Sequence, residues 1–148
     1  MQAQSNVFKI RNLVPPCVAH AVLCTWLNGW ATSRRYQQES GGCRFNRDCR
    51  GRDEIEHYAA CAFFRRSLTT SACIPARSND IRQFLLVDAV EVDMLIKQAV
   101  AIFAAYGTFN KARAKDTRFD ETTCRLVALE RIRFAISRHK RVKVAFGQ

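Results

Sequence analysis

A chain of 148 residues in which 48% are hydrophobic, with ten phenylalanines among them, is long and apolar enough to fold around a core, which excludes an intrinsically disordered protein. Only six glycines and three prolines argue against an all-β protein built on many tight turns. The formal net charge of +11 indicates a polyanionic partner, nucleic acid before an anionic membrane surface.

Cysteine usage and the N-terminus indicate the cellular compartment. Seven cysteines are an odd number, so a fully paired disulfide set would leave one thiol over. Residues 1–10 contain neither an apolar signal core nor a cleavage signature, so we expect an intracellular protein of the nucleus or cytoplasm, not a secreted one. In a reducing compartment, clustered cysteines and histidines favour a metal site over disulfides. The longest apolar run, residues 99–107, is about half of what a bilayer span needs, so no membrane partner is expected.

The first predicted helix covers residues 17–28. Pro15 and Pro16 suit its first turn, where the missing N–H of proline costs nothing, and Asn28-Gly29 predicts its end. Its predicted apolar face consists of Val14, Val18, Ala21, Val22 and Thr25, extended by Leu23, Leu27 and Trp30.

A second helix is predicted to begin at Asp53 and to end at about Leu68. Asp53 is a good N-cap residue, and Glu56 three positions later completes a capping box. The helix would then carry both His57 and Cys61.

The polar stretch 69–79 predicts a loop and is the best internal boundary in the chain. It separates residues 1–70, which hold the first helix and the cysteine-rich region, from residues 71–148, a helical region with a basic tail. The short apolar run 81–87 is compatible with either a strand or a helical turn.

Two longer helices are predicted after that boundary. The first covers about residues 89–112, and Asp116-Thr117 predicts the cap of the last one. Their predicted apolar stripes consist of Leu95, Ala99, Ile102, Phe103, Tyr106 and Phe109 in the first and of Leu126, Leu129, Ile132, Phe134 and Ile136 in the last. The expected fold is therefore all-α, with four to five helices and a small Cys-Cys-His-Cys knuckle between the first two.

The knuckle itself consists of Cys43, Cys49, His57 and Cys61. Structural zinc takes four thiolate or imidazole ligands in a closed tetrahedron. His57 and Cys61 are four residues apart, so on a helix both side chains leave one face. Cys43 and Cys49, on a loop bounded by glycines, can supply the other half. The sequence therefore predicts that these four residues bind Zn²⁺.

The spacing of the first pair leaves an alternative open. Five residues separate Cys43 from Cys49, where zinc sites usually have two to four, and a wider loop loses more entropy on closing. Asn46 stands where a Cys-x-x-Cys pattern would place its second thiol. Either Cys49 replaces it as a ligand, or the site binds no metal, Cys49 and Cys61 are packing residues and His57 caps a polar group.

Four stretches of the chain, the first of them Val14-Pro15-Pro16, resemble a known family. Residues 25–37 are Thr-Trp-Leu-Asn-Gly-Trp-Ala-Thr-Ser-Arg-Arg-Tyr-Gln, residues 43–45 are Cys-Arg-Phe, and residues 53–61 are Asp-Glu-Ile-Glu-His-Tyr-Ala-Ala-Cys. They are similar to the zinc-knuckle region after the reverse transcriptase domain in polyproteins of non-LTR (LINE-type) retrotransposons, above all the copies abundant in dinoflagellate genomes. The likeness covers roughly residues 10–68 and, weakly, the helices beyond.

The resemblance implies a zinc-knuckle tail that helps a polyprotein to grip RNA or target DNA, with a larger polymerase polypeptide as a further partner. Cys43, His57 and Cys61 match family ligand positions, and Asn46 occupies the second one, with Cys49 as a stand-in. Two further positions where the family often has cysteine are Leu27 and Ala31.

No catalytic centre is predicted. No two aspartates are adjacent, so the paired-aspartate metal site of a polymerase is missing, and no Gly-rich phosphate loop or Gly-x-Ser-x-Gly elbow is present. Asp88, Glu91 and Asp93 are interpreted as the solvated edge of a helix, against a nuclease Mg²⁺ site as the alternative. Four protein ligands leave zinc no open position for catalysis, and only Glu54 and Glu56 offer a general base nearby.

Basic and aromatic residues crowd around the predicted knuckle. Arginine forks suit phosphate, and aromatic rings such as those of Tyr36, Phe45 and Tyr58 can stack on unpaired bases. A merely solvated face is the alternative, which weak salt dependence of binding would indicate. The predicted nucleic-acid-binding residues are Arg34, Arg35, Tyr36, Arg44, Arg47, Arg50, Arg52, Arg65 and Arg66.

The favoured hypothesis is a non-enzymatic zinc-knuckle module that binds RNA or DNA. In a first alternative, zinc is a structural staple and the amphipathic helices pack on a protein partner such as a larger polymerase. In a second, the chain is a retroelement fragment without a selected function.

Overall fold

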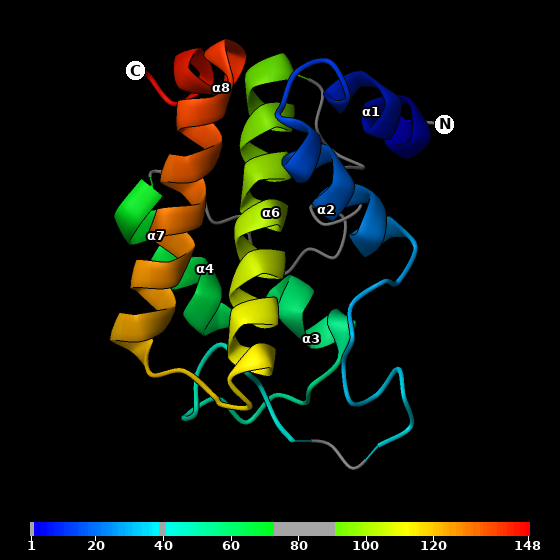
Figure 1. Ribbon diagram of the computed structural model, residues 1–148, viewed down its shortest axis with the longest axis vertical. Coiled ribbons are helices and arrows are strands. Elements are labelled where there is room, and N and C mark those ends of the chain that lie inside the picture. The colour runs from blue at the N-terminus through cyan, green and yellow to red at the C-terminus, as the bar shows by residue number, and fades with distance from the viewer. Residues whose placement is uncertain (1, 39–40, 73–90) are drawn as a thin grey trace.

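The computed structural model describes residues 2–38, 41–72 and 91–148, and these residues form helices and connecting loops (Figure 1). Within them there are seven helices and no strand: α1 (Gln2–Ile10), α2 (Pro16–Trp26), α3 (Ile55–Ala60), α4 (Ala62–Ala72), α6 (Val92–Ala114), α7 (Glu121–Arg138) and α8 (Lys140–Ala145). The all-α class is therefore confirmed. The prediction of four to five helices is too low. The predicted position of the knuckle is wrong by one helix, because the unpredicted α1 precedes α2 and the cysteine-rich segment lies between α2 and α3.

The central element is α6, which contacts α1, α2, α7 and α8. Figure 1 shows it between α2 and α7, and α4 packs on α7. A helix that is apolar on every side needs neighbours all round, and the predicted stripe of α6 is only part of its buried surface. By length and composition α6 also qualifies as a membrane span; core helices of globular proteins pass the same test, and 67% of its most apolar 18-residue window is buried inside the protein.

Helix α2 buries most of its predicted face, including Val18, Val22 and Thr25. Leu23 and Leu27 are exposed at 46% and 70%, so that part of the prediction is wrong. Leu23 lies inside α2 but off its buried face, and Leu27 follows the end of α2 at Trp26, where the predicted Asn28-Gly29 stop ends the helix. Asn28 adopts a φ of 53°, and the Gly29 N–H donates to the carbonyl of Cys24, which closes the helix in a Schellman motif.

The predicted stripe of α7 is wrong in part, because Ile132 and Ile136 are buried as expected and two other members are not. Leu126 and Phe134 are exposed at 62% and 40%. Small residues take part in the buried face of α7, which packs against both α6 and α4. The buried residues of α7 are Cys124, Val127, Ala128, Ile132, Ala135 and Ile136.

The predicted single helix over residues 53–68 is two helices that meet at Cys61. Cys61 has a φ of −62° and a ψ of 115°, an extended conformation that interrupts the helix between α3 and α4. Asp53 is not the N-cap; Glu54 holds that position without a capping side chain. The Asp53 carboxylate instead accepts hydrogen bonds from Ser33 and Tyr58, so the capping-box prediction is wrong because a tertiary network takes the carboxylate.

The connection between α6 and α7 also differs from its prediction. Asp116 ends α6 with a φ of 47°, and the Thr117 N–H donates to the carbonyl of Ala112, again a Schellman motif. The N-cap of α7 is Asp120, whose carboxylate accepts from the Thr123 N–H at 2.7 Å. The predicted Asp116-Thr117 cap therefore terminates one helix and does not begin the next.

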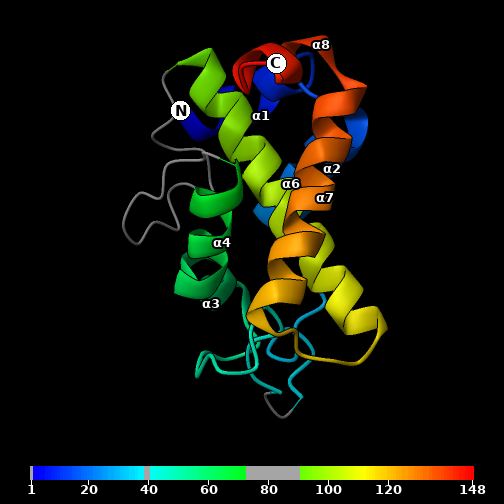
Figure 2. The same ribbon diagram turned by 90° about the vertical axis from the view of Figure 1, so that its left-hand side faces the viewer.

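The two ends of the molecule differ in content. Both views show the loops of residues 27–38 and 41–54 at one end of the helices, and α1, α8 and the two chain ends near the other (Figure 2). Helix α4 extends to Ala72, so the first part of the predicted 69–79 loop is helical. The rest of that loop and the run 81–87 lie outside the described residues, and the boundary after residue 70 stays a prediction.

Candidate metal centre

Cys43, Cys49, His57 and Cys61 form one compact cluster. Each offers one ligand atom, and these atoms all lie within 4.8 Å of one another. The Sγ atoms of Cys43 and Cys61 are 3.8 Å apart, and the Sγ of Cys49 is 3.4 Å from the Nε2 of His57. A tetrahedral ion with metal–sulfur bonds of about 2.3 Å and metal–nitrogen bonds of about 2.0 Å sets its ligand atoms about 3.8 Å (S to S) and about 3.5 Å (S to N) apart. The cluster can therefore hold a metal ion such as zinc.

The α3–α4 break presents two of the ligands. His57 lies on α3, and Cys61 is the residue in extended conformation between α3 and α4. The Cys61 sulfur thus stands at the N-terminus of α4, where it accepts a hydrogen bond from the Phe64 N–H. His57 and Cys61 therefore lie together as their i, i+4 spacing predicts, although α3 ends at Ala60, one residue before Cys61.

The other two ligands lie on a loop that we call the metal loop, residues 43–51. The Cys43 N–H donates to the Gly51 carbonyl at 2.9 Å, which closes the loop at its ends. Asn46 is 2% exposed, and its side-chain oxygen accepts from the Asp48 N–H at 2.8 Å, while its carbonyl accepts from the Cys49 N–H. Asn46 is therefore a turn residue. This turn brings Cys49 into the cluster in spite of the wide spacing.

Gly51 is required by the packing of the histidine. A Cβ atom placed on Gly51 would collide with the imidazole of His57 at Cε1, Nδ1 and Nε2. The Gly51 N–H also donates to the Cys49 sulfur at 3.4 Å. The ring of His57 therefore lies directly on the backbone of the metal loop, which orients its Nε2 toward the thiols.

The protonation pattern of the thiols suits a metal that competes with protons. The hydrogen bond from Cys43, together with His57 and the Phe64 N–H, lowers the pKa of Cys61 to about 4. The same hydrogen bond, together with burial, raises the pKa of Cys43, and desolvation raises that of Cys49. These directions make Cys61 the most readily ionised of the three thiols, and a bound cation would favour ionisation of the other two.

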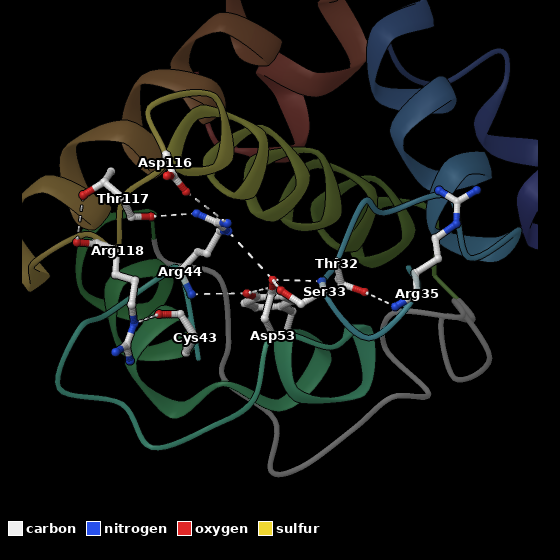
Figure 3. Close-up of polar contacts among 10 residues, drawn as sticks. Thr32, Ser33, Arg35, Cys43, Arg44, Asp53, Asp116, Thr117 and Arg118 are labelled. Carbon is white, nitrogen blue, oxygen red and sulfur yellow. Dashed lines mark hydrogen bonds and ion pairs between the residues drawn. The ribbon is translucent and has the colours of Figure 1, made fainter. Parts of the chain in front are cut away.

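Arg118 completes the surroundings of the cluster, and the sequence analysis missed it. Its Nε donates to the Cys43 carbonyl at 2.8 Å, and its Nη2 donates to the carbonyls of Cys49 at 2.8 Å and Asn46 at 3.4 Å. Figure 3 shows the side chain extending from the connection between α6 and α7 toward Cys43. Arg118 is 69 residues beyond Cys49 in the chain, and no local spacing pattern points to it.

A buried polar network supports the other side of the metal loop. The Asp53 carboxylate accepts from the backbone and hydroxyl of Ser33 and from the hydroxyl of Tyr58, whose pKa is raised by burial so that it remains a donor. Arg44 lies 3.8 Å from this carboxylate, and its Nη1 donates to the Thr117 carbonyl at 3.2 Å (Figure 3). The network joins the segment after Trp30, the metal loop, α3 and the end of α6.

The predicted nucleic-acid-binding residues divide into two groups. The guanidinium of Arg44 is used inside the network, and Arg65 is partly buried and donates to the Ala60 carbonyl at 2.8 Å. The others are exposed; of these, Arg34 pairs with Glu54 at 3.3 Å, and Arg66 lies over the ring of Phe63. The exposed members are Arg34, Arg35, Tyr36, Arg47, Arg50, Arg52 and Arg66.

The aromatic residues offered for base stacking also divide. Phe45 and Tyr58 are 0% and 1% exposed and pack against each other in the core, so they cannot stack on a ligand in this structure. Tyr36 is 52% exposed, with the guanidinium of Arg35 over its ring. Of the acidic trio, Glu91 and Asp93 are exposed, and Asp88 lies outside the described residues.

Comparison with known proteins adds no assignment: no family model, no curated protein and no solved structure matches this chain. What the protein does is therefore inferred from its own residues.

Proposed function

We propose that this protein is a non-enzymatic accessory module that binds zinc through Cys43, Cys49, His57 and Cys61 and uses the surface around that centre to bind RNA or DNA. The observation that carries the proposal is the juxtaposition, within residues 43–61, of a four-residue ligand cluster and exposed arginines that form no ion pair among the described residues. Three thiolates and one imidazole are soft to borderline ligands, which suit Zn²⁺ and leave it no open position.

The exposure of three arginines without ion-pair partners supports a phosphate-binding surface. Arg47, Arg50 and Arg52 are all exposed, and none of them forms an ion pair with another described residue. Arg113 and Lys115, exposed at the C-terminal end of α6, extend the positive surface, because the connection that follows them is hydrogen-bonded to the metal loop. Unpaired guanidinium forks are free to bind phosphate oxygens in pairs.

The resemblance to the tail of retroelement polyproteins gives this proposal a biological setting. In that setting the module is intracellular, has no polymerase active site of its own, and acts beside a larger polymerase polypeptide on RNA or target DNA. Tyr36 is the exposed aromatic ring that supports contact with an unpaired base.

The first experiment counts metal. The chain is produced in zinc-supplemented medium, and zinc per chain is measured by elemental analysis for the wild type and for His57→Ala. One zinc per wild-type chain, lost in the variant, is the expected result. A folded wild type without metal would remove the zinc centre from the proposal.

The second experiment tests the nucleic-acid surface by charge-matched variants. The triple change of Arg47, Arg50 and Arg52 to Gln is compared with a triple change of Arg133, Arg138 and Lys140 to Gln, which are exposed on α7 and α8. Binding to single-stranded RNA and duplex DNA is measured against salt. The first set is expected to reduce the salt slope by about 2 to 3, and the second to leave it unchanged. Equal effects of the two sets would indicate only nonspecific attraction by net charge.

A structural or protein-interaction domain is the second candidate, and exposed apolar residues favour it. Leu23 and Leu27 on or beside α2 and Leu126 and Phe134 on α7 expose between 40% and 70% of their surface. In that case zinc acts as a staple, the charge variants leave function intact, and Leu27→Glu abolishes association with a protein partner such as a polymerase.

A further inference from the structure

We propose that Arg118 is a positioning residue of the metal centre, and that through it metal binding orders the connection between α6 and α7, residues 115–120. The metal site is then not an autonomous module of residues 43–61, because the metal loop is held in place by Arg118, which lies about 70 residues further along the chain. The inference rests on the metal site of the proposed function and is independent of nucleic-acid binding.

The geometry around the guanidinium carries the inference. Three carbonyls of the metal loop, those of Cys43, Asn46 and Cys49, converge on the Nε and Nη2 atoms of Arg118. Two of them belong to the residues that supply thiol ligands. A planar fork with fixed donor directions sets the relative positions of those two residues, which a flexible loop with five intervening residues does not do by itself.

Close packing at the start of the loop adds a second constraint. A Cβ atom on Gly42 would lie 3.1 Å from the Cζ and Nη2 atoms of Arg118, and Gly42 has a φ of +78°. The guanidinium therefore lies against the bare backbone that leads into Cys43. Glycine is needed here both for its conformation and for the approach of the arginine.

Charge balance gives Arg118 a second task. A divalent ion with three thiolates and a neutral imidazole carries a net charge of about −1 by summing formal charges, and a buried net charge needs a compensating partner. Cys43 and Cys61 are 0% and 1% exposed. The partly buried guanidinium of Arg118, held against the loop, supplies the positive charge.

Backbone bonds carry the coupling from the loop to the helices. The Arg47 N–H donates to the Phe119 carbonyl at 2.8 Å, and the Phe119 N–H donates to the Arg44 carbonyl at 3.0 Å. Phe119 is 5% exposed and belongs to the core cluster. A metal that fixes the metal loop therefore fixes Phe119 and the start of α7 with it.

The test compares three variants of the full chain: Arg118→Met, Arg118→Lys and, as a control arginine on the helix that follows, Arg125→Met. Among the described residues Arg125 forms one ion pair, with Glu121 at 3.5 Å, and it has no hydrogen bond to the metal loop. Zinc affinity is measured by competition with a chromophoric chelator, the ligand set by the absorption spectrum of the Co²⁺ form, and the coupling by hydrogen exchange at the amides of Arg47 and Phe119 with and without zinc.

The expected result is a fall in zinc affinity of about 10- to 100-fold for Arg118→Met, as for other residues that orient metal ligands. Its Co²⁺ spectrum should change, and the zinc-dependent protection of Phe119 should disappear. Arg118→Lys should keep less than full affinity, because one ammonium does not hold three carbonyls, and Arg125→Met should match the wild type.

Either of two outcomes would overturn the inference. One is wild-type zinc affinity and Phe119 protection in Arg118→Met; the other is full affinity in Arg118→Lys, which would leave charge alone as the role of Arg118. If Arg118→Met does not fold, the lysine variant decides. A wild type that binds no zinc would instead refute the metal centre of the proposed function, so the two failures are distinguishable.

Discussion

The helical bundle and the metal-loop end of this protein are stabilised by different interactions. Around α6, residues such as Ile96, Ala99 and Val100 are fully buried, and the helices hold together by apolar packing. Around the cluster of Cys43 and His57, the chain runs through loops and one short helix. Hydrogen bonds donated by arginines and accepted by a buried aspartate add there to the packing of Phe45 on Tyr58. Apolar packing is non-directional, whereas a buried hydrogen-bond network stabilises the fold only when each donor and acceptor has its partner.

The difference shows why a metal is useful at one end only. The loops that carry the ligands have little regular structure, so the conformational entropy lost on ordering them is not offset by the regular hydrogen bonds of a helix. Four ligand atoms spaced for a tetrahedral ion can supply the missing free energy, as in small zinc-dependent domains. Substitutions at the metal-loop end, at Trp30 and at the start of α7 therefore test this difference between the two ends.

The largest effect is expected from removing the ligand that the sequence left in doubt. Cys49→Ala should abolish stoichiometric zinc, because only three ligands remain. Asn46→Ala removes one hydrogen bond, that to the Asp48 N–H, worth about 1 kcal/mol, and should weaken zinc binding only about fivefold. Elemental analysis and chelator competition measure both. Stoichiometric, tight zinc in Cys49→Ala would show that Asn46 or another group is the fourth ligand.

The joint between the two ends is Trp30. It is 0% exposed and stacks on Tyr58 of α3 and packs against Tyr106 and Phe109 of α6, with ring centroids 5.1 to 5.6 Å apart. Trp30→Ala should lower the free energy of unfolding by about 3–5 kcal/mol, as for other large-to-small core changes.

The neighbouring Leu27 provides the control for that measurement. It is 70% exposed, so Leu27→Ala should change the free energy of unfolding by less than about 0.5 kcal/mol. Denaturant titration of the zinc-loaded protein measures both variants. A small loss in Trp30→Ala would mean that the bundle and the metal loop fold without a shared core.

A third prediction tests the fit between the metal loop and the histidine. Gly51→Ala places a methyl group in the space of the His57 ring and should reduce zinc affinity about 10- to 100-fold, since the ligand must move. Gly41→Ala is the matched control, because a Cβ there meets no atom within 4 Å. Chelator competition on both variants is the measurement, and unchanged affinity in Gly51→Ala would exclude His57 Nε2 as a ligand in this orientation.

The sequence allowed prediction of features that depend on neighbours in the chain, and failed where distant segments decide. The four ligand candidates follow from local spacing, and the end of α2 follows from Asn28-Gly29. The predicted proximity of His57 and Cys61 is confirmed, even though α3 ends before Cys61.

The failures have a common physical cause, which is that tertiary contacts override local pattern. Leu126 and Phe134 fit a helical period, but α7 packs against both α6 and α4 and buries a face that includes Ala128 and Ala135. Asp53 looked like a cap, but Ser33 and Tyr58 take its carboxylate. Arg118 carries no local signal at all, because its partners are 69 to 75 residues away.

The smallest predicted effect concerns the link between the two regions, at the first turn of α7. The hydrogen bond from the Thr123 N–H to the Asp120 carboxylate holds the pKa of Asp120 below its ordinary value of 3.8. A carboxyl whose pKa is depressed by folding stabilises the protein above its unfolded-state pKa, and that contribution is lost as the pH falls through the folded-state pKa. Asp120→Ala should therefore lower Tm slightly at neutral pH, and the difference from wild type should shrink below a pH of about 3.8.

The matched variant for this prediction is Asp120→Asn, which keeps an acceptor oxygen for the Thr123 N–H but does not titrate. Thiolate ligands also take up protons in acid, so wild type and both variants all lose stability as the pH falls. The asparagine variant shares that loss but lacks the contribution of the carboxylate. The Tm gap between Asp120→Asn and Asp120→Ala should therefore stay constant with pH while the gap between wild type and Asp120→Ala closes. A wild-type gap that does not change in acid would show that the Asp120 carboxylate does not cap α7 in solution.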